Sequence, residues 1–119
     1  MAKLDKYQRF FRDVNRAYKK GIVCPVKDIH YRHSNQKEFG CALTAAYMAN
    51  GNEVQDELNA HTEIREWAEK HYGFTNGEIG EIERFFDGNE CSREEVTPAA
   101  KVAKRLSEKH QPIYEEDAR

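Results

Sequence analysis

The chain of 119 residues is long enough for one domain, since single domains usually hold about 100–150 residues. Charged residues make up 34% of it, hydrophobic residues 39%, and the formal net charge is −2. No apolar run approaches the roughly 18 residues of a membrane span, and the charged N-terminus lacks the apolar segment of a secretory signal. With three cysteines, an odd number, these features argue against membrane, secreted and fibrous classes and lead us to expect a cytoplasmic protein.

Charge is distributed unevenly along the chain. Residues 1–40 contain ten Lys/Arg and four Asp/Glu, residues 41–97 contain four and thirteen, and residues 98–119 contain five and four. The three segments therefore carry net charges of +6, −9 and +1. Such polarity can orient a charged partner or a second copy of the chain through long-range fields. The alternative is that the basic and acidic segments of one chain pack beside each other.

The first predicted helix begins near Leu4 and ends before Gly21, a glycine placed where one commonly follows the last helical turn. Its apolar residues recur at steps of three and four, so they share one stripe. The opposite arc is basic, and we expect it to form part of a partner-binding surface. The stripe contains Leu4, Tyr7, Phe11, Val14 and Tyr18, and the basic arc contains Arg9, Arg12, Arg16, Lys19 and Lys20.

Residues 22–40 show no helical period, contain Pro25 and carry a Ser34-Asn35 turn signal, so they predict an irregular loop or a short strand pair. The next segment, Cys41 to Ala49, combines strong helix formers with alanines that allow close approach of neighbouring helices, and Asn50-Gly51 ends it.

A capping box at Asn52 predicts the start of the following helix, which would carry Val54 and Leu58. Ile64, Trp67, Ala68 and His71 continue at helical spacing until Gly73. Trp67 is expected in the core, against the 41–49 helix and the Phe85/Phe86 pair.

Thr75 and Glu78 form a second capping box, which predicts a helix ending at Asp87-Gly88. The last helix could start after Ser92, but Thr97-Pro98 is an equally good cap, and we predict the main helix at residues 98–110. The expected fold is a single all-α domain over residues 1–110, a compact orthogonal bundle of about five helices, followed by a mobile polar tail at 111–119.

Two kinds of chemistry can be read from Cys24, His30, His33 and Cys41, which fall within 18 residues. They could hold zinc, although their spacing lacks the usual close ligand pairs. Cys41, at a predicted helix N-terminus, could instead be a nucleophile with His30 or His33 as its base, but burial under the next helical turns would raise its thiol pKa. Neither pattern assigns a catalytic residue, a metal or a cofactor, and the common hydrolase and nucleotide-binding motifs are missing.

Binding of nucleic acid is a further alternative, because residues 62–86 could form a helix-turn-helix. Residues 61–88 contain three basic and seven acidic side chains, whereas phosphate contacts need cations. The basic first helix is the better candidate for such contacts. The glutamates of the middle segment instead predict an acidic binding surface made of Glu63, Glu66, Glu69, Glu81 and Glu83.

Three strings, GCALTAAYMANG, HYGFTNGEIGEIERFFDG and PAAKVAKRLSEKH, resemble a group of small bacterial and phage proteins without assigned activity. The resemblance covers roughly residues 39–110 and rests on helix caps and small-residue packing, with Thr44 where glycine is frequent in the group. It implies a shared fold and an origin in a mobile element, and it carries over no catalytic residue.

These observations favour a non-enzymatic cytoplasmic interaction or regulatory protein that acts through charged surfaces. Its partner would be another protein or a second copy of the chain, rather than a membrane. A phage-type inhibitor of a host complex is a specific form of this hypothesis. A metal-binding or cysteine-dependent enzyme and a nucleic-acid-associated protein remain as alternatives.

Overall fold

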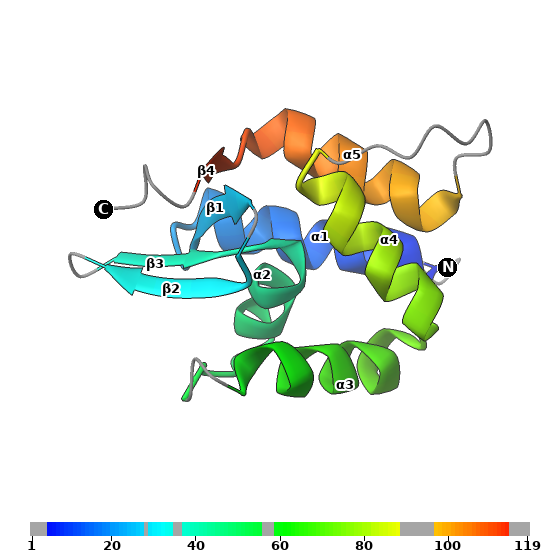
Figure 1. The fold of residues 1–119 in the computed structure, drawn as a ribbon, viewed down its shortest axis with the longest axis horizontal. Helices are drawn as coiled ribbons and strands as arrows, with labels where there is room; N and C mark the ends of the chain where they lie inside the picture. The colour runs from blue at the N-terminus through cyan, green and yellow to red at the C-terminus, as the bar shows by residue number, and fades with distance from the viewer. Residues whose placement is uncertain (1–4, 28, 35–36, 56–58, 89–96, 115–119) are drawn as a thin grey trace.

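A computed structural model describes residues 5–27, 29–34, 37–55, 59–88 and 97–114 of the chain (Figure 1). Within these ranges the chain forms five helices and four short strands. In chain order they are α1 (Lys6–Lys19), β1 (Cys24–Lys27), β2 (Tyr31–Ser34), β3 (Lys37–Gly40), α2 (Ala42–Ala49), α3 (Ala60–Tyr72), α4 (Asn76–Phe86), α5 (Pro98–His110) and β4 (Ile113–Tyr114).

The strands form one mixed sheet in the order β2-β3-β1-β4, so the expectation of an all-α fold is wrong. β2 and β3 are an antiparallel hairpin, the strand pair that residues 22–40 allowed, and β1 runs parallel to both β3 and β4. Strands of two to four residues are at or below the shortest length over which a period of two indicates a strand. The pairing of Val26 with Ile113 also joins residues from opposite ends of the chain, which no local pattern can reveal.

Beyond α5 the chain therefore returns to the sheet, and Ile113 and Tyr114 form its edge strand beside β1. The Lys27 Nζ lies 3.8 Å from the centre of the Tyr114 ring, a cation–π contact that supports this edge. The first part of the segment that we expected to be a tail thus belongs to the fold, and residues 115–119 lie outside the described part of the chain.

Local signals placed the ends of most helices correctly. Thr75 and Glu78 form the expected capping box of α4, and Thr97 caps α5 ahead of Pro98. Gly21 and Gly73 have φ angles of 70° and 80°, the left-handed conformation that glycine adopts readily after a helix. The alternative start at Ser92 lies outside the described residues.

The helix expected from Asn52 does not form there, and α3 begins only at Ala60. The Asn52 side chain donates its amide to the carbonyl of Tyr47 at the end of α2, 3.0 Å away. Asn52 therefore belongs to the end of α2 rather than to the cap of a new helix. Leu58, predicted on the same helix, lies outside the described residues.

The buried face of α1 is rotated relative to the predicted stripe. Phe10 and Ala17 are fully buried, whereas Phe11 is only partly buried and lies on the side toward α5. Val14 and Tyr18 of the predicted stripe are buried as expected, and Phe10, which the stripe did not include, packs edge-on against Tyr72 and Phe74. Asp13, which follows Arg12 in the chain, also lies on the buried face of α1.

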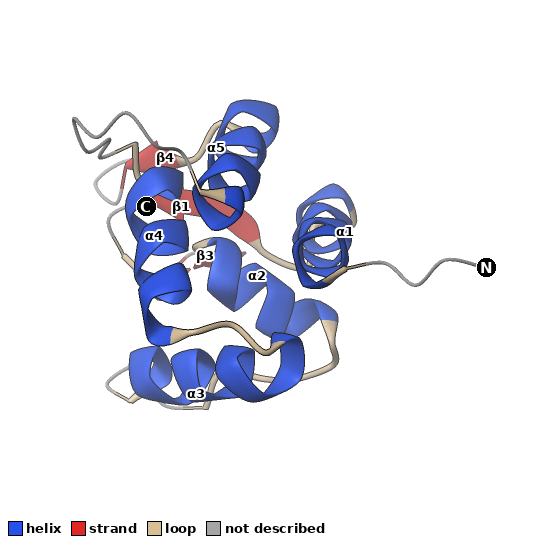
Figure 2. Cartoon of the chain, turned by 90° about the vertical axis from the view of Figure 1, so that its right-hand side faces the viewer, coloured by secondary structure: helices blue, strands red, loops and turns tan. Residues whose placement is uncertain are grey.

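Helix α2 lies in the middle of the molecule, between α1, α3 and α4 (Figure 2). Its small residues allow this close packing, and a Cβ built on Gly40 would stand 2.7 Å from the Thr44 Cγ2. Trp67 is only partly buried, in contrast to its predicted place in the core. Its ring contacts Tyr47 of α2 as expected, but Phe86 stacks on Tyr18 instead.

No helix in the described part of the chain is long and apolar enough to cross a membrane.

Candidate functional site

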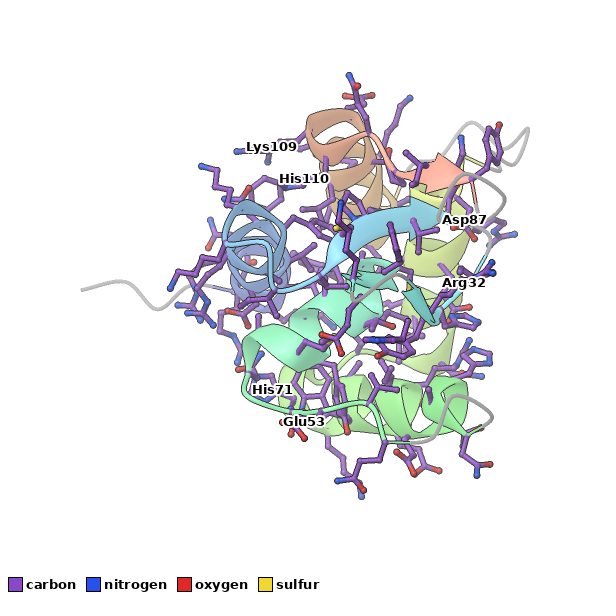
Figure 3. All side chains as sticks on the ribbon, turned by 90° about the vertical axis from the view of Figure 1, so that its left-hand side faces the viewer. Arg32, Glu53, His71, Asp87, Lys109 and His110 are labelled. Carbon is purple, nitrogen blue, oxygen red and sulfur yellow. The ribbon has the colours of Figure 1, made fainter. Side chains whose placement is uncertain are left out.

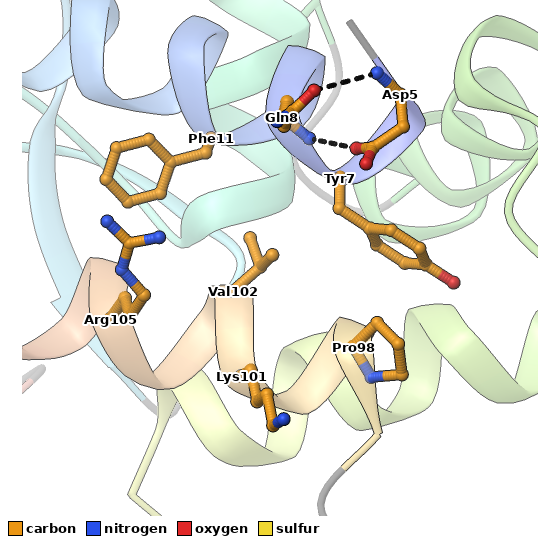
Figure 4. A pocket seen from close by; sticks show the side chains of 8 residues that line it. All are labelled: Asp5, Tyr7, Gln8, Phe11, Pro98, Lys101, Val102 and Arg105. Carbon is orange, nitrogen blue, oxygen red and sulfur yellow. Dashed lines mark hydrogen bonds between the residues drawn. The ribbon is translucent and has the colours of Figure 1, made fainter.

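A groove of about 330 Å³ runs between α1 and α5 (Figure 4). Tyr7, Phe11 and Val102 give it an apolar floor, and Lys101 and Arg105 of α5 are exposed at its rim. Asp5, Gln8 and Pro98 complete the lining. We refer to these eight residues as the basic groove.

Basic side chains of α5 line one side of the basic groove. The Arg105 guanidinium lies 4.7 Å from the centre of the Phe11 ring, and the Lys109 Nζ lies 5.6 Å from it. Both are cation–π contacts, which orient the positive charges over the apolar floor. Lys109 and His110 lie at the end of α5 near α1 (Figure 3). Burial first, and then the charges of Lys109 and Lys19, lower the pKa of His110, whose Nε2 lies 3.1 Å from the Asn15 Oδ1.

The other end of the basic groove is fixed by Glu78 of α4. Lys6 donates to the Glu78 carboxylate at 2.8 Å, and the Tyr7 hydroxyl donates to its second oxygen. Burial raises the pKa of Glu78, but the hydrogen bonds from Lys6, Tyr7 and the Thr75 backbone together with the Lys6 charge outweigh it and lower the pKa to about 2. Glu78 is thus an anion at neutral pH and ties the start of α1 to α4.

Three residues of the predicted basic surface contact partners within the fold, and the other two are exposed lysines. Arg12 and Arg16 pair with the buried carboxylate of Asp13, and Arg9 lies over the Tyr72 ring with 5.7 Å between the guanidinium carbon and the ring centre. Lys19 and Lys20 are exposed.

The predicted acidic surface is divided in the same way. Glu63, Glu66 and Glu69 are exposed on α3. Glu81 accepts a hydrogen bond from Thr97, and Glu83 pairs with Arg65 at 2.8 Å. These last two carboxylates therefore have partners inside the fold.

Asp13, only 1% exposed, is the centre of a buried polar network that joins α1, α2 and α3. The Tyr72 hydroxyl donates to its Oδ2 at 2.6 Å, and the Asn50 amide donates to the same oxygen at 3.3 Å. The guanidinium groups of Arg12 and Arg16 lie 3.3 and 3.5 Å from Oδ1. Burial and the bond to Asp13 raise the pKa of Tyr72 well above its ordinary value, so its hydroxyl stays a donor. We call these five residues the Asp13 cluster.

The four cysteines and histidines singled out by the sequence do not form one centre. Cys24 lies opposite Phe39 in the sheet, and His33 is exposed on β2. His30 and Cys41 do meet, with 3.9 Å between the His30 Nδ1 and the Cys41 Sγ. Burial raises the pKa of the Cys41 thiol to about 11, so at neutral pH the sulfur is a protonated thiol rather than a nucleophilic thiolate.

His30 instead joins two residues from distant elements. Its ring stacks on that of His61 in α3, with 3.8 Å between ring centres, and the His61 Nε2 lies 3.3 Å from the Glu83 Oε1 in α4. Arg65 also bonds Glu83. Burial first, then the charges of His61 and Arg65, lower the pKa of His30, while Glu83 opposes them. We call His30, His61, Arg65 and Glu83 the histidine cluster.

The donor atoms of His30, His61 and Glu83 all lie within 4.8 Å of one another. These are the residues in the described part of the chain that could hold a metal ion. No sequence pattern indicates this set, because its members come from the β1–β2 loop, α3 and α4, with no ligand spacing between them. Glu83 entered the prediction only as a surface charge.

No family model, curated protein or solved structure matches this chain. The resemblance to small bacterial and phage proteins therefore remains a prediction from three sequence strings.

Proposed function

We propose that this chain is a protein-binding module whose basic groove holds an acidic, partly apolar segment of another protein. The observation that carries the proposal is an apolar floor between α1 and α5 within a rim of cations. An apolar floor favours burial of a partner's aliphatic or aromatic side chain, and the rim favours carboxylates beside it.

The charges of the two helices support this choice of partner. α1 contains five basic residues and one acidic residue, and α5 contains four and one. Their combined field attracts an anionic segment and raises its rate of encounter with the groove. A cytoplasmic regulatory role is part of the proposal, and charge polarity supports it. Its specific form as a phage-type inhibitor of a host complex rests on the size of the chain and on the resemblance of its sequence strings.

A second copy of the chain is a less suitable occupant. The exposed glutamates of α3 could supply the negative charge, but a partner segment also needs an apolar side chain. Among the described residues the exposed large hydrophobic ones are Ile22, Ile113 and Tyr114, and none of them lies on α3.

Nucleic acid would match the cations but not the floor. Phosphate contacts need an accessible row of basic groups, and single-stranded bases need open aromatic faces. A base stacked on Phe11 would have to displace Arg105 and Lys109 from its ring, whereas the carboxylates of an acidic segment can pair with these cations where they lie.

The test is a fluorescence anisotropy titration with a labelled peptide in which glutamates flank two leucines one helical turn apart. A shuffled peptide and labelled single-stranded and duplex DNA serve as competing probes. We expect the peptide with the unshuffled sequence to bind more tightly than the other probes at low salt. Its affinity should fall as ionic strength rises from about 0.05 to 0.5 M, because screening shortens the range of charge attraction.

Charge reversal locates the binding surface. Lys101→Glu with Arg105→Glu should weaken peptide binding about tenfold or more, because two rim cations become anions. Lys37→Glu with Lys70→Glu makes the same change in net charge at exposed positions on β3 and α3, and should leave binding nearly unchanged. Equal weakening in both double variants would contradict the proposal. Tighter binding of DNA than of peptide would replace it with the nucleic-acid alternative.

A further inference from the structure

We propose that His30, His61 and Glu83 form a binding site for one divalent transition-metal ion of the zinc class. This inference goes beyond the proposed function, because it concerns a different side of the molecule from the basic groove. Two imidazoles and one carboxylate, with a fourth position left for water or another ligand, are a common donor set for zinc in proteins.

The spacing of two donors already suits a metal ion. The His61 Nε2 and the Glu83 Oε1 are 3.3 Å apart. Zinc bonds to nitrogen and oxygen of about 2.0–2.2 Å give a distance of about 3.3 Å between neighbouring ligands of a tetrahedron. An ion can therefore be placed between this pair without moving α3 relative to α4.

The third donor, His30, is held by the start of α2. Its backbone carbonyl accepts a bond from the Thr44 hydroxyl at 2.6 Å and another from the Cys41 backbone N–H at 3.1 Å. The Cys41 Sγ lies 3.9 Å from the His30 Nδ1 and is a neighbour of the ring. The backbone of His30 is thus fixed, so only its imidazole ring has to rotate when a metal ion binds.

Coordination requires one local movement. The rings of His30 and His61 are stacked at an angle of 11°, whereas a metal ion lies in the plane of each imidazole that binds it. The rings must therefore tilt apart when the ion enters. The His61 side chain is 45% exposed, so it has room to rotate toward the ion.

Arg65 provides the positive charge at this position in the metal-free protein. Its Nη1 lies 2.8 Å from the Glu83 Oε1 and 3.5 Å from the His61 Nε2, close to the two donors that the ion would bind. Its Nη2 donates to the Asn76 Oδ1 at 2.6 Å, a bond that can keep the side chain in place when Nη1 is displaced. The metal ion and the guanidinium therefore compete for the same carboxylate.

The experiment is a titration of the untagged, metal-free full chain with Co²⁺, followed by visible absorption and then by competition with Zn²⁺. We expect one ion per chain and the intense absorption bands of a tetrahedral site. His61→Ala and Glu83→Gln should each weaken Co²⁺ binding by about tenfold or more, which is the low end of the loss seen even for outer-shell partners of metal ligands. His71→Ala, at an exposed position on the same helix, is the matched control and should bind like the wild type.

Arg65→Met gives the sharpest outcome, because an Arg65 that competes with the ion and an Arg65 that supports the site predict opposite results. Loss of the competing charge should strengthen Co²⁺ binding, whereas a site that needs Arg65 as a support would weaken. Circular dichroism and thermal melting of each variant check that the fold is intact. The proposal is overturned if the wild-type chain binds neither ion in the micromolar range. It is also overturned if a folded His61→Ala variant binds as well as wild type, or if a folded Arg65→Met variant binds less. None of these results bears on the peptide-binding test of the basic groove.

Discussion

Helix α3 contributes to two polar clusters, one at each end, and the clusters differ in how their charges are satisfied. Tyr72 at its C-terminal end donates to Asp13, a carboxylate that is 1% exposed and has four donors around its two oxygens. His61 and Arg65 near its N-terminal end meet Glu83 and His30, where the His61 side chain is 45% exposed.

The difference separates a structural role from a binding role. A buried carboxylate is tolerated only when it is paired and hydrogen-bonded. The bonds of the Asp13 cluster therefore have a structural role, which is to connect α1, α2 and α3. The histidine cluster is partly exposed through His61, and the donor atoms of His30, His61 and Glu83 lie within 4.8 Å of one another. Loss of Asp13 should therefore unfold the protein more readily than loss of any member of the histidine cluster.

The largest expected effect is that of Asp13→Ala. It leaves the Tyr72 hydroxyl without its acceptor and removes the anion that Arg12 and Arg16 face, whereas the Asn50 amide keeps its bond to the Ala46 carbonyl. We expect a loss of about 3 kcal/mol in the free energy of unfolding. Urea denaturation followed by circular dichroism measures it. Asp13→Asn keeps one acceptor oxygen and should lose less. Equal stability of the two variants would contradict this explanation, because the acceptor oxygen that Asp13→Asn keeps would then contribute nothing.

Glu78 is an intermediate case, a partly buried carboxylate with a cation beside it. Its pKa is lowered from 4.5 to about 2, so its stabilising contribution is complete above pH 4.5 and is lost as the pH falls toward 2. We expect a modest contribution of about 1 kcal/mol, because Lys6 is 29% exposed and solvent screens the pair. Glu78→Gln can keep the capping box of α4, and it removes the charge and the acceptor of the Tyr7 hydroxyl. Its melting temperature should be lower than wild type at pH 7 and should fall less between pH 4.5 and pH 2.

The smallest effect is expected for His61→Ala in the absence of metal. The side chain is exposed and its partner Glu83 keeps Arg65, so the free energy of unfolding should change by no more than about 0.5 kcal/mol. Urea denaturation of metal-free protein tests this. A loss as large as that of Asp13→Ala would show that the histidine cluster supports the fold and would remove the contrast between the two ends of α3.

The candidate sites could be predicted only in part. The sequence predicted that His30 and Cys41 lie close together, and they do. It also grouped them with Cys24 and His33, which lie apart from them on β1 and β2. His61 and Glu83 reach His30 only because α3 and α4 pack beside the start of α2. Phe11 was assigned to the core, whereas it forms part of the groove floor, because the buried face of α1 includes Phe10 and Ala17 beside Val14 and Tyr18.

The sequence by itself determined where most helices begin and end. Thr75, Thr97 and Gly73 act on backbone groups three or four residues away, so their effect does not depend on the rest of the chain. Tertiary structure decided the rest: the parallel strands beside β1, the burial of Asp13 and the meeting of His30, His61 and Glu83. Each of these joins residues far apart in the chain, and a distant partner is fixed only when packing of the whole core brings the two segments together.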